Sequence, residues 1–393
     1  MGTGDGTVVG TTQIVNNGPP TARWNLVIMG DGYQSAQLGQ FANDVQSFVN
    51  ILFATPPFDT LRRAVNVYRV DVSSTDSGAA DPTACGGTGA VPRTYFDASF
   101  CHNGIRRLLE VNTTTALAVA GAQVPQWNMV MVIVNSTVYG GSGGGVATFS
   151  LDPSANEIGL HEMGHTAFNF ADEYESYAGC GVDPPGTHDH HPAVEPMQPN
   201  VTIDANGATN KWRDLVLSTT PMPTTTNADC SQCDPQPNPV SADTVGAFEG
   251  ADYYHCGAYR PQFTCRMRAL GNPYCAVCQR TIRTTLAPHM PAAAGSGGRM
   301  AARSRIPNSM EGWWVGADGS IQDAFWYDGA TWQRFTLAPA GSAALGSRVA
   351  AVSRIPNSME VWWVRADGSI QDAFWYDGAT WQQFTLAPAG SAS

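Results

Sequence analysis

Apolar residues in the first half of the chain occur either in short runs or at helical spacing, and this pattern predicts a mixed α and β fold. Three apolar runs are expected to form strands: 24–29, 65–72 and 128–134. Helical spacing predicts three helices: 36–53, 105–111 and 153–170. Before the last helix, the glycine-rich stretch 140–145 predicts a loop, and 146–150 a short edge strand.

The last predicted helix carries signals for its own ends. Asp152 precedes it and can cap its first turn. Asn169 tolerates the left-handed backbone conformation that ends many helices, so the chain is expected to turn back there.

The periodic patterns fade after residue 177. A stretch rich in proline and threonine extends from there to about residue 240, and such composition predicts loops. We therefore expect an α/β subdomain faced by a loop-rich subdomain.

The C-terminal part of the chain is an internal repeat. Residues 304–343 and 353–392 align without gaps, and they differ only at Gly312/Val361, Gly316/Arg365 and Arg334/Gln383. Each copy reads as short strands separated by Asp-Gly turn signals. A period of about 50 residues with four short strands is typical of a propeller blade. The Ala/Gly/Pro/Ser-rich stretch 287–302 predicts a flexible linker before the repeats.

The charge balance excludes several classes of function. The 393 residues include 21 basic and 33 acidic side chains, which give a net charge of −12, and Lys211 is the only lysine. Such a chain lacks the excess of basic residues that binding to nucleic acid or anionic lipid requires. No uninterrupted apolar run approaches the roughly 18 residues that a membrane span requires, so we expect none.

The nine cysteines indicate an oxidising compartment and a secreted protein. Eight of them fall into pairs that are close in sequence, and Cys180 is left over: Cys85/Cys101, Cys230/Cys233, Cys256/Cys265 and Cys275/Cys278. Disulfides within these pairs are favoured, although the two Cys-x-x-Cys pairs leave a structural zinc site open. Residues 1–20 lack the basic and apolar regions of a signal peptide, so we expect an incomplete or trimmed N-terminus.

The predicted helix at 153–170 contains an HExxH motif, HEMGH at 161–165. Positions i and i+4 lie on one face of a helix, so His161 and His165 can bind one zinc ion. Glu162 stands beside them and can act as the general base that activates a water molecule. This combination predicts a metal-dependent hydrolase.

A catalytic zinc site needs a third protein ligand. If the chain turns back at Asn169, Asp172 is presented to the metal, which makes it our predicted third ligand. Glu173 and the histidine cluster His188, His190 and His191 are rival candidates.

Several segments resemble the immunoglobulin-A-peptidase family of bacterial zinc metallopeptidases. The resemblance runs from about residue 24 to 286 and includes these segments: NLVIMGDGY at 25–33, NVYRVD at 66–71, YGGSG at 139–143, HEMGHTAFNFADEY at 161–174, NVT at 200–202, YRP at 259–261, CRMR at 265–268 and CAVC at 275–278. It implies a metzincin-like catalytic domain with zinc in a cleft below an edge strand. The implied zinc ligands are His161, His165 and Asp172, with Glu162 catalytic and Met267 in a methionine turn beneath the metal.

The repeats resemble blades of tectonin-like and fucose-binding bacterial propeller lectins, on the segment SRIPNSMEVWWVRADGSIQDAFWYDG at 353–378. Two blades would leave open edges, so we expect either a longer native chain or assembly of several chains. Four tryptophans are candidates for stacking on sugars, although core packing is the preferred reading: Trp313, Trp314, Trp362 and Trp363. The repeats are therefore predicted to bind carbohydrate.

These observations divide the chain into parts. They are an N-terminal tail (1–23), a zinc metallopeptidase domain (24–286), a flexible linker (287–302) and two blade-like repeats (303–351 and 352–393). We expect a secreted zinc endopeptidase that acts on a protein or peptide, glycosylated or immunoglobulin-like as in some family members. Residues 146–149 would pair with the substrate as an edge strand, and Tyr259 would donate to the oxyanion. The alternatives are a lectin-type adhesin with a vestigial peptidase domain and a zinc enzyme acting on non-peptide amides.

Overall fold

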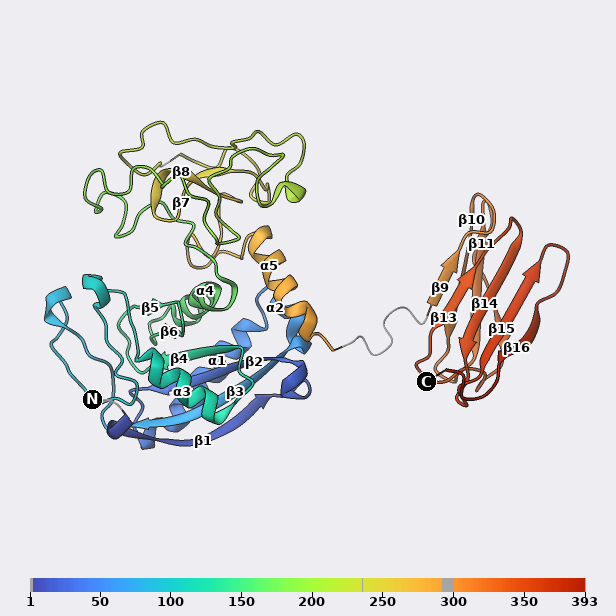
Figure 1. The fold of residues 1–393 in the computed structure, drawn as a ribbon, viewed down its shortest axis with the longest axis horizontal. Helices are drawn as coiled ribbons and strands as arrows, with labels where there is room; N and C mark the ends of the chain where they lie inside the picture. The colour runs from blue at the N-terminus through green and yellow to red at the C-terminus, as the bar shows by residue number, and fades with distance from the viewer. Residues whose placement is uncertain (1–2, 235, 292–299, 393) are drawn as a thin grey trace. The chain divides into compact units, whose positions relative to one another are not determined.

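The computed structural model describes residues 3–234, 236–291 and 300–392 of the chain, which divides into two compact units, 1–290 and 291–393 (Figure 1). Within the predicted linker, residues 292–299 lie outside the described residues. None of the helices in the described ranges has the length and apolar character that a membrane span needs.

The first unit is built on one six-stranded sheet with the order β1-β3-β2-β4-β6-β5. Four central strands run parallel: β2 (Trp24–Asp31), β3 (Val65–Ser74), β4 (Met129–Val134) and β6 (Ala147–Phe149). Strands β1 (Gly6–Val15) and β5 (Gly141–Ser142) are antiparallel to their neighbours at the two ends. The three strands predicted from apolar runs are therefore confirmed.

Helices cover both faces of this sheet, which explains why its central strands are apolar on both sides. One face packs against α1 (Leu38–Leu52), α4 (Ala155–Phe168) and α5 (Ala276–Leu286), and α2 (Phe58–Leu61) lies in the same core. The other face packs against α3 (Thr113–Gln123). Neighbouring residues of β2 divide between the two cores, with Ile28 in one and Met29 in the other.

Three sequence predictions about this unit are wrong. Residues 6–15, within the predicted tail 1–23, form β1, because the backbone of this segment pairs with β3 at one end of the sheet. The helix predicted at 105–111 is instead irregular chain whose backbone pairs with its neighbours, including Leu108 with Gly141. Strand β6 is not an edge strand, because β4 and β5 pair with its two sides.

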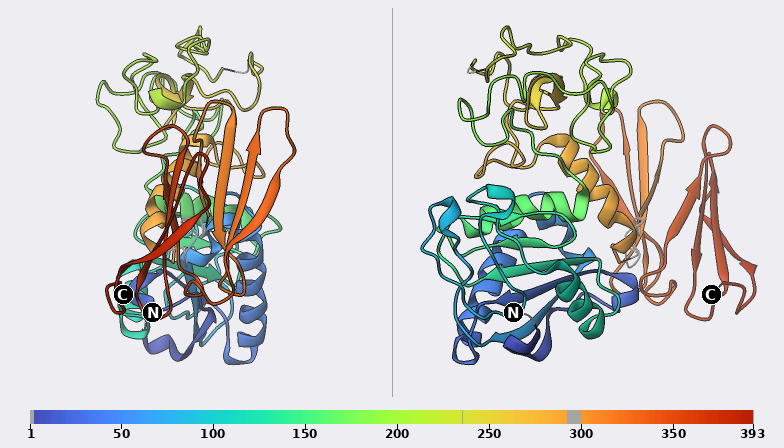
Figure 2. Two further views of the ribbon diagram at one scale, coloured as in Figure 1. Left: turned by 90° about the vertical axis from the view of Figure 1, so that its right-hand side faces the viewer. Right: turned by 60° about the vertical axis from the view of Figure 1, so that its left-hand side comes forward.

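The segment between α4 and α5 is almost free of regular structure. It holds the hairpin of β7 (Phe248–Ala251) and β8 (Tyr254–Arg260), and it lies across α4 from the sheet in the views of Figures 1 and 2. Short 3₁₀ turns complete the unit: Thr3–Asp5, Pro20–Ala22, Ser35–Gln37, Arg62–Ala64, Thr83–Cys85, His102–Gly104, Arg213–Leu215 and Ala287–His289. The predicted contrast between an α/β part and a loop-rich part is confirmed.

The disulfides are only partly those predicted from sequence proximity. Cys85–Cys101 is confirmed, but the other two bonds join cysteines far apart in the chain: Cys180–Cys233 and Cys230–Cys256. The predicted pairs 230/233, 256/265 and 275/278 are wrong, because the folding of the loops brings other cysteines together. Cys265, Cys275 and Cys278 are buried and form no disulfide. The three disulfides indicate an oxidising environment.

The second unit consists of two four-stranded antiparallel sheets, one for each repeat. The first contains β9 (Met300–Arg303), β10 (Ser309–Val315), β11 (Ile321–Tyr327) and β12 (Gln333–Ala338). The second contains β13 (Val349–Val352), β14 (Ser358–Val364), β15 (Ile370–Tyr376) and β16 (Gln382–Ala387). The predicted boundary at 351/352 cuts through β13, because each sheet begins a few residues earlier than the sequence repeat.

A common core joins the two sheets of the second unit. Trp313 of one repeat and Trp363 of the other are buried in it, so core packing explains these two of the four candidate tryptophans. Trp314 and Trp362 are half-buried. Among the described residues, the two sheets do not close into a propeller.

Candidate metal centre and active-site cleft

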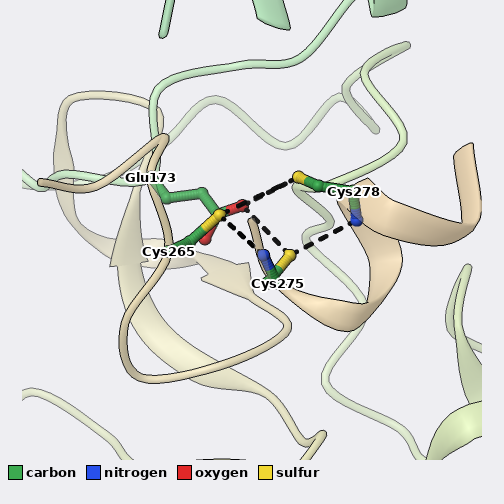
Figure 3. A group of neighbouring side chains, drawn as sticks. All are labelled: Glu173, Cys265, Cys275 and Cys278. Carbon is green, nitrogen blue, oxygen red and sulfur yellow. Dashed lines mark hydrogen bonds between the residues drawn. The ribbon is translucent and has the colours of Figure 1, made fainter. Parts of the chain in front are cut away.

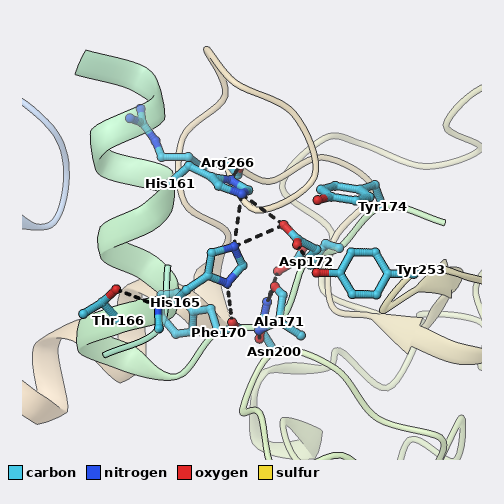
Figure 4. Close-up of polar contacts among 12 residues, drawn as sticks. His161, His165, Thr166, Phe170, Ala171, Asp172, Tyr174, Asn200, Tyr253 and Arg266 are labelled. Atoms are coloured by element: carbon cyan, nitrogen blue, oxygen red, sulfur yellow. Dashed lines mark hydrogen bonds and ion pairs between the residues drawn. The ribbon is translucent and has the colours of Figure 1, made fainter. Parts of the chain in front are cut away.

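Helix α4 carries the HExxH motif and ends where the sequence predicts. Its start differs from the prediction: the N-cap is Ser154, and the side chain of Asp152 accepts the backbone N–H of Ser154 at 2.8 Å and caps no N–H of the helix. At its end, Asn169 takes the left-handed conformation, with φ 54° and ψ 40°. The chain therefore reverses, and Asp172 returns to the face that His161 and His165 share (Figure 4).

Three side-chain atoms converge at this point. Asp172 Oδ1 lies 3.0 Å from His161 Nε2 and 3.3 Å from His165 Nε2, and the two nitrogens are 3.2 Å apart. Ligand atoms bonded to one zinc ion at about 2.0–2.1 Å in tetrahedral geometry would lie roughly 3.3 Å apart. The spacing therefore fits a single ion of that size.

The hydrogen bonds of the two imidazoles favour a cation between them. His161 Nδ1 lies 3.1 Å from the carbonyl of Arg266, and His165 Nδ1 lies 2.7 Å from the carbonyl of Phe170. Because a carbonyl can only accept, both Nδ1 atoms must carry the hydrogen. In neutral imidazoles both Nε2 atoms then present lone pairs toward each other and toward the Asp172 carboxylate. Only protons or a metal ion can hold such a group of acceptors together.

The pKa values of these side chains also favour a cation at this position. Burial would lower the pKa of His165, but the charge of Asp172 outweighs it and raises that pKa to about 10. Burial would raise the pKa of Asp172, but the two histidines hold it well below its usual range. The site therefore recruits positive charge as protons when no ion is bound.

Glu162 is buried next to this group, on the same helix. Its burial raises the pKa of the carboxyl, an effect that the neighbouring histidines oppose. The glycine-rich loop packs directly on this part of the helix. A Cβ at Gly141 would lie 2.8 Å from Glu162 Oε1, and one at Gly143 would lie 2.4 Å from His165 Cβ. Glycine is thus required where the loop backbone approaches the motif.

Two further residues position Asp172, and neither role was predicted from the sequence. The hydroxyl of Tyr253 donates to Asp172 Oδ2 at 2.6 Å. The side-chain amide of Asn200 brackets Ala171, accepting from its N–H and donating to its carbonyl, both at 2.9 Å. Asn200 belongs to the NVT segment of the resemblance, which was the only available signal for it.

The three predicted metal ligands face a cleft of about 520 Å³. His161, Glu162, His165 and Asp172 all line it, so the structure brings these four predicted site residues together. The remaining wall includes glycine backbone, aromatic side chains and two half-buried arginines: Gly141, Gly143, Gly144, Tyr139, Tyr174, Tyr177, Tyr253, Arg107 and Arg268. Arg107 donates to the backbone carbonyl of Tyr177 at 3.1 Å.

Other predicted site residues lie elsewhere. Tyr259 is on β8 and is absent from the described residues that line the cleft, and burial and Glu249 raise its pKa to about 12. The predicted oxyanion role of Tyr259 therefore has no geometric support. Met267 is fully buried under α4, and a Cβ at Gly164 would lie 2.6 Å from its sulfur.

The rival third ligands also lie outside this cleft. Of the histidine cluster, His191 Nε2 contacts Asp252 at 3.1 Å and His188 Nδ1 lies 3.6 Å from Asp183, whereas His190 is exposed. Glu173 points away from the motif, toward the three free cysteines. None of these residues is among the described residues that line the cleft.

Comparisons with known proteins add a family assignment for the first unit. The family model "IgA Peptidase M64" matches residues 12–233 and 237–286. No curated protein matches the chain.

Solved structures give only partial similarities. The BP39L lectin from Burkholderia pseudomallei is 25% identical over 24% of this chain and 28% of its own, with a TM-score of 0.22. AofleA from Arthrobotrys oligospora is 20% identical over 22% and 25%, with a TM-score of 0.20. The six-bladed β-propeller lectin from Aleuria aurantia is 23% identical over 24% and 33%, with a TM-score of 0.19. The chain thus spans at most about a third of each of these lectins.

Proposed function

The chain belongs to the IgA Peptidase M64 family, and on that premise we propose that it is a secreted zinc endopeptidase whose metal ligands are His161, His165 and Asp172. The observation that carries this proposal is the convergence of three lone-pair-bearing atoms within 3.0–3.3 Å of one another. The reversal of the chain after α4 and the position of Met267 below the motif support a metzincin-like site. The three disulfides support an extracellular location.

The residues of the cleft suggest how hydrolysis proceeds. When bound, the zinc ion would polarise the scissile carbonyl and acidify a water molecule. Glu162 accepts a proton from the attacking water and passes it to the leaving amine, a role for which burial, by raising its pKa, prepares it. The backbone at 141–144, kept bare by glycine, provides a wall along which an extended peptide lies.

Digestion of casein in the presence and absence of a chelator tests this function. We expect the full chain to cleave casein, a chelator to stop the cleavage, and added Zn²⁺ to restore it. Cleavage that persists after verified metal removal would contradict a metal-dependent mechanism. No cleavage of any protein by the zinc-loaded chain would favour the adhesin with a vestigial peptidase domain.

We also propose that the second unit binds carbohydrate, because polar and aromatic side chains meet between its two sheets. The guanidinium of Arg305 lies over the rings of Tyr327 and Trp375, at 4.8 and 4.5 Å from their centroids. Its Nε is 3.9 Å from a carboxylate oxygen of Glu311. Aromatic faces and paired charges of this kind suit the apolar faces and the hydroxyls of a sugar.

Deletion of residues 291–393 should separate the two activities. Because the chain divides into compact units at this point, we expect the shortened chain to hydrolyse a small peptide at the rate of the full chain. We expect it to lose retention on immobilised glycans, and the full-length Arg305→Ala variant to lose it as well. Loss of peptide hydrolysis on deletion would mean that the repeats belong to the catalytic unit. Glycan retention by the shortened chain would contradict a sugar site in the repeats.

A further inference from the structure

A second group of metal-binding side chains is buried in the first unit, apart from the cleft. It consists of Cys265, Cys275 and Cys278, which form no disulfide, together with Glu173 (Figure 3). All four residues are at most 3% exposed, and one ligand atom from each lies within 4.8 Å of the others. The other six cysteines of the chain form three disulfides, so three buried thiols need a separate explanation.

The spacing of these atoms is that of ligands around one ion. Cys265 Sγ and Cys278 Sγ are 3.9 Å apart, and Glu173 Oε1 lies 3.6 Å from both Cys275 Sγ and Cys278 Sγ. Around a tetrahedral zinc ion with Zn–S of about 2.3 Å and Zn–O of about 2.1 Å, sulfurs lie roughly 3.8 Å apart and sulfur and oxygen roughly 3.6 Å. A disulfide would instead require a sulfur–sulfur distance of about 2.05 Å.

Backbone N–H groups donate to two of the three sulfurs. Cys275 is the N-cap of α5, and its sulfur accepts the backbone N–H of Cys278 at 3.4 Å. The backbone N–H of Cys275 in turn donates to Cys265 Sγ at 3.3 Å. Backbone donors and the positive end of a helix stabilise negative charge on sulfur.

The buried carboxylate of Glu173 also favours a bound cation. Its Oε1 accepts a hydrogen bond from the Asn200 side chain at 2.9 Å besides its contacts with Cys275 Sγ and Cys278 Sγ, whereas Oε2 has no hydrogen-bond partner among the described residues. A buried carboxylate next to three thiols is costly unless something positive compensates it. Soft thiolate ligands with one carboxylate suit Zn²⁺ in a closed, structural site.

We propose that Cys265, Cys275, Cys278 and Glu173 bind a second zinc ion, which has a structural role. This ion would link the segment that contains Asp172 to the segment that contains Arg266 and Met267. Glu173 follows Asp172 directly, and its N–H donates to the carbonyl of Met267 at 2.8 Å. The neighbouring carbonyl of Arg266 is the one that faces His161 Nδ1 at 3.1 Å. The second ion therefore fixes the turn that presents Asp172 and the loop that orients His161.

Metal and thiol analysis of the full chain tests the proposal. We expect two zinc ions per chain by mass spectrometry of the metals, and three thiols that react with a thiol reagent after denaturation in chelator. One zinc and one thiol would mean that two of the three cysteines form a disulfide, which overturns the proposal. One zinc and three thiols, with that ion lost in His161→Ala/His165→Ala and retained in Cys278→Ser, would mean a metal-free thiol group, which overturns it equally.

Variants distinguish the two sites from each other. Cys275→Ser retains a good N-cap for α5 and should reduce the content from two ions to one, as should Cys278→Ser. His161→Ala/His165→Ala should also leave one ion, held by the cysteines. The matched control is Cys180→Ser/Cys233→Ser, which removes two cysteines from a disulfide and should leave both ions bound. If both cysteine-site variants retain two ions, the second site does not exist.

Cobalt provides a readout that does not depend on activity. With Co²⁺ in place of zinc, the cysteine site should show thiolate-to-metal charge-transfer absorption in the near ultraviolet, because sulfur ligates the ion. The His161→Ala/His165→Ala chain should keep this absorption and Cys278→Ser should lose most of it. Equal spectra for the two variants would overturn the assignment of the cysteines as ligands.

Discussion

The Glu162→Gln variant is expected to bind zinc as the unaltered chain does and to lose peptide hydrolysis. Glutamine preserves the shape of the side chain that packs against Gly141, and the three ligand atoms are unchanged. It cannot accept the proton of the attacking water. Loss of such a group typically lowers the rate by about 10²–10⁴. The measurement is the turnover of a quenched fluorescent peptide, with the metal content determined on the same sample.

Glu110→Gln provides a matched control for this variant. Glu110 lines the same cleft, but its carboxylate pairs with His102 at 3.0 Å rather than with the metal-binding group. We expect only a small change in turnover for this control. Near-normal turnover of the zinc-loaded Glu162→Gln chain would exclude Glu162 as the general base.

The second large effect is expected from Asp172→Ala, which should weaken zinc binding at the histidine site. Loss of an outer hydrogen-bond partner already lowers metal affinity about 10–100-fold, so the loss of a ligand should cost at least about 100-fold. Asp172→Asn keeps the side-chain shape and a possible contact with Tyr253 but removes the charge, and it should weaken binding in the same direction. Competition with a chromophoric chelator measures both affinities.

The triple variant His188→Ala/His190→Ala/His191→Ala is the control for the third ligand. These histidines contact Asp183 and Asp252 or are exposed, so we expect their loss to leave zinc affinity unchanged. If the triple variant loses zinc and Asp172→Ala retains it, the third ligand is a histidine of this cluster.

The helix that carries the HExxH motif could be predicted because its signals are local. Helical spacing and the tolerance of Asn169 for positive φ are properties of neighbouring residues, and the structure reproduces both, whereas the N-cap is Ser154 and not Asp152. The reversal that brings Asp172 back follows from the same turn. The buried strands could also be predicted from the sequence, because strands covered on both faces are continuously apolar.

Contacts between distant segments could not be predicted in this way. The loops of 169–275 have no periodic pattern, so nothing in the sequence pairs Cys180 with Cys233 or places Tyr253 on Asp172. Cys275 and Cys278 were predicted to form a disulfide because they are close in sequence. In the structure they stand one helical turn apart at the start of α5 and group with Cys265 and Glu173. The order of the strands could not be predicted from the sequence either. For this reason β6, which lies between β4 and β5, was predicted to be an edge strand.

Anomalous scattering at the zinc absorption edge, measured on crystals of the full chain, tests the proposed catalytic ligand set most directly. We expect an anomalous peak about 2.0–2.2 Å from His161 Nε2, His165 Nε2 and a carboxylate oxygen of Asp172. The account would be contradicted by the absence of any peak between these three side chains, or by a peak at His188, His190 and His191 in its place.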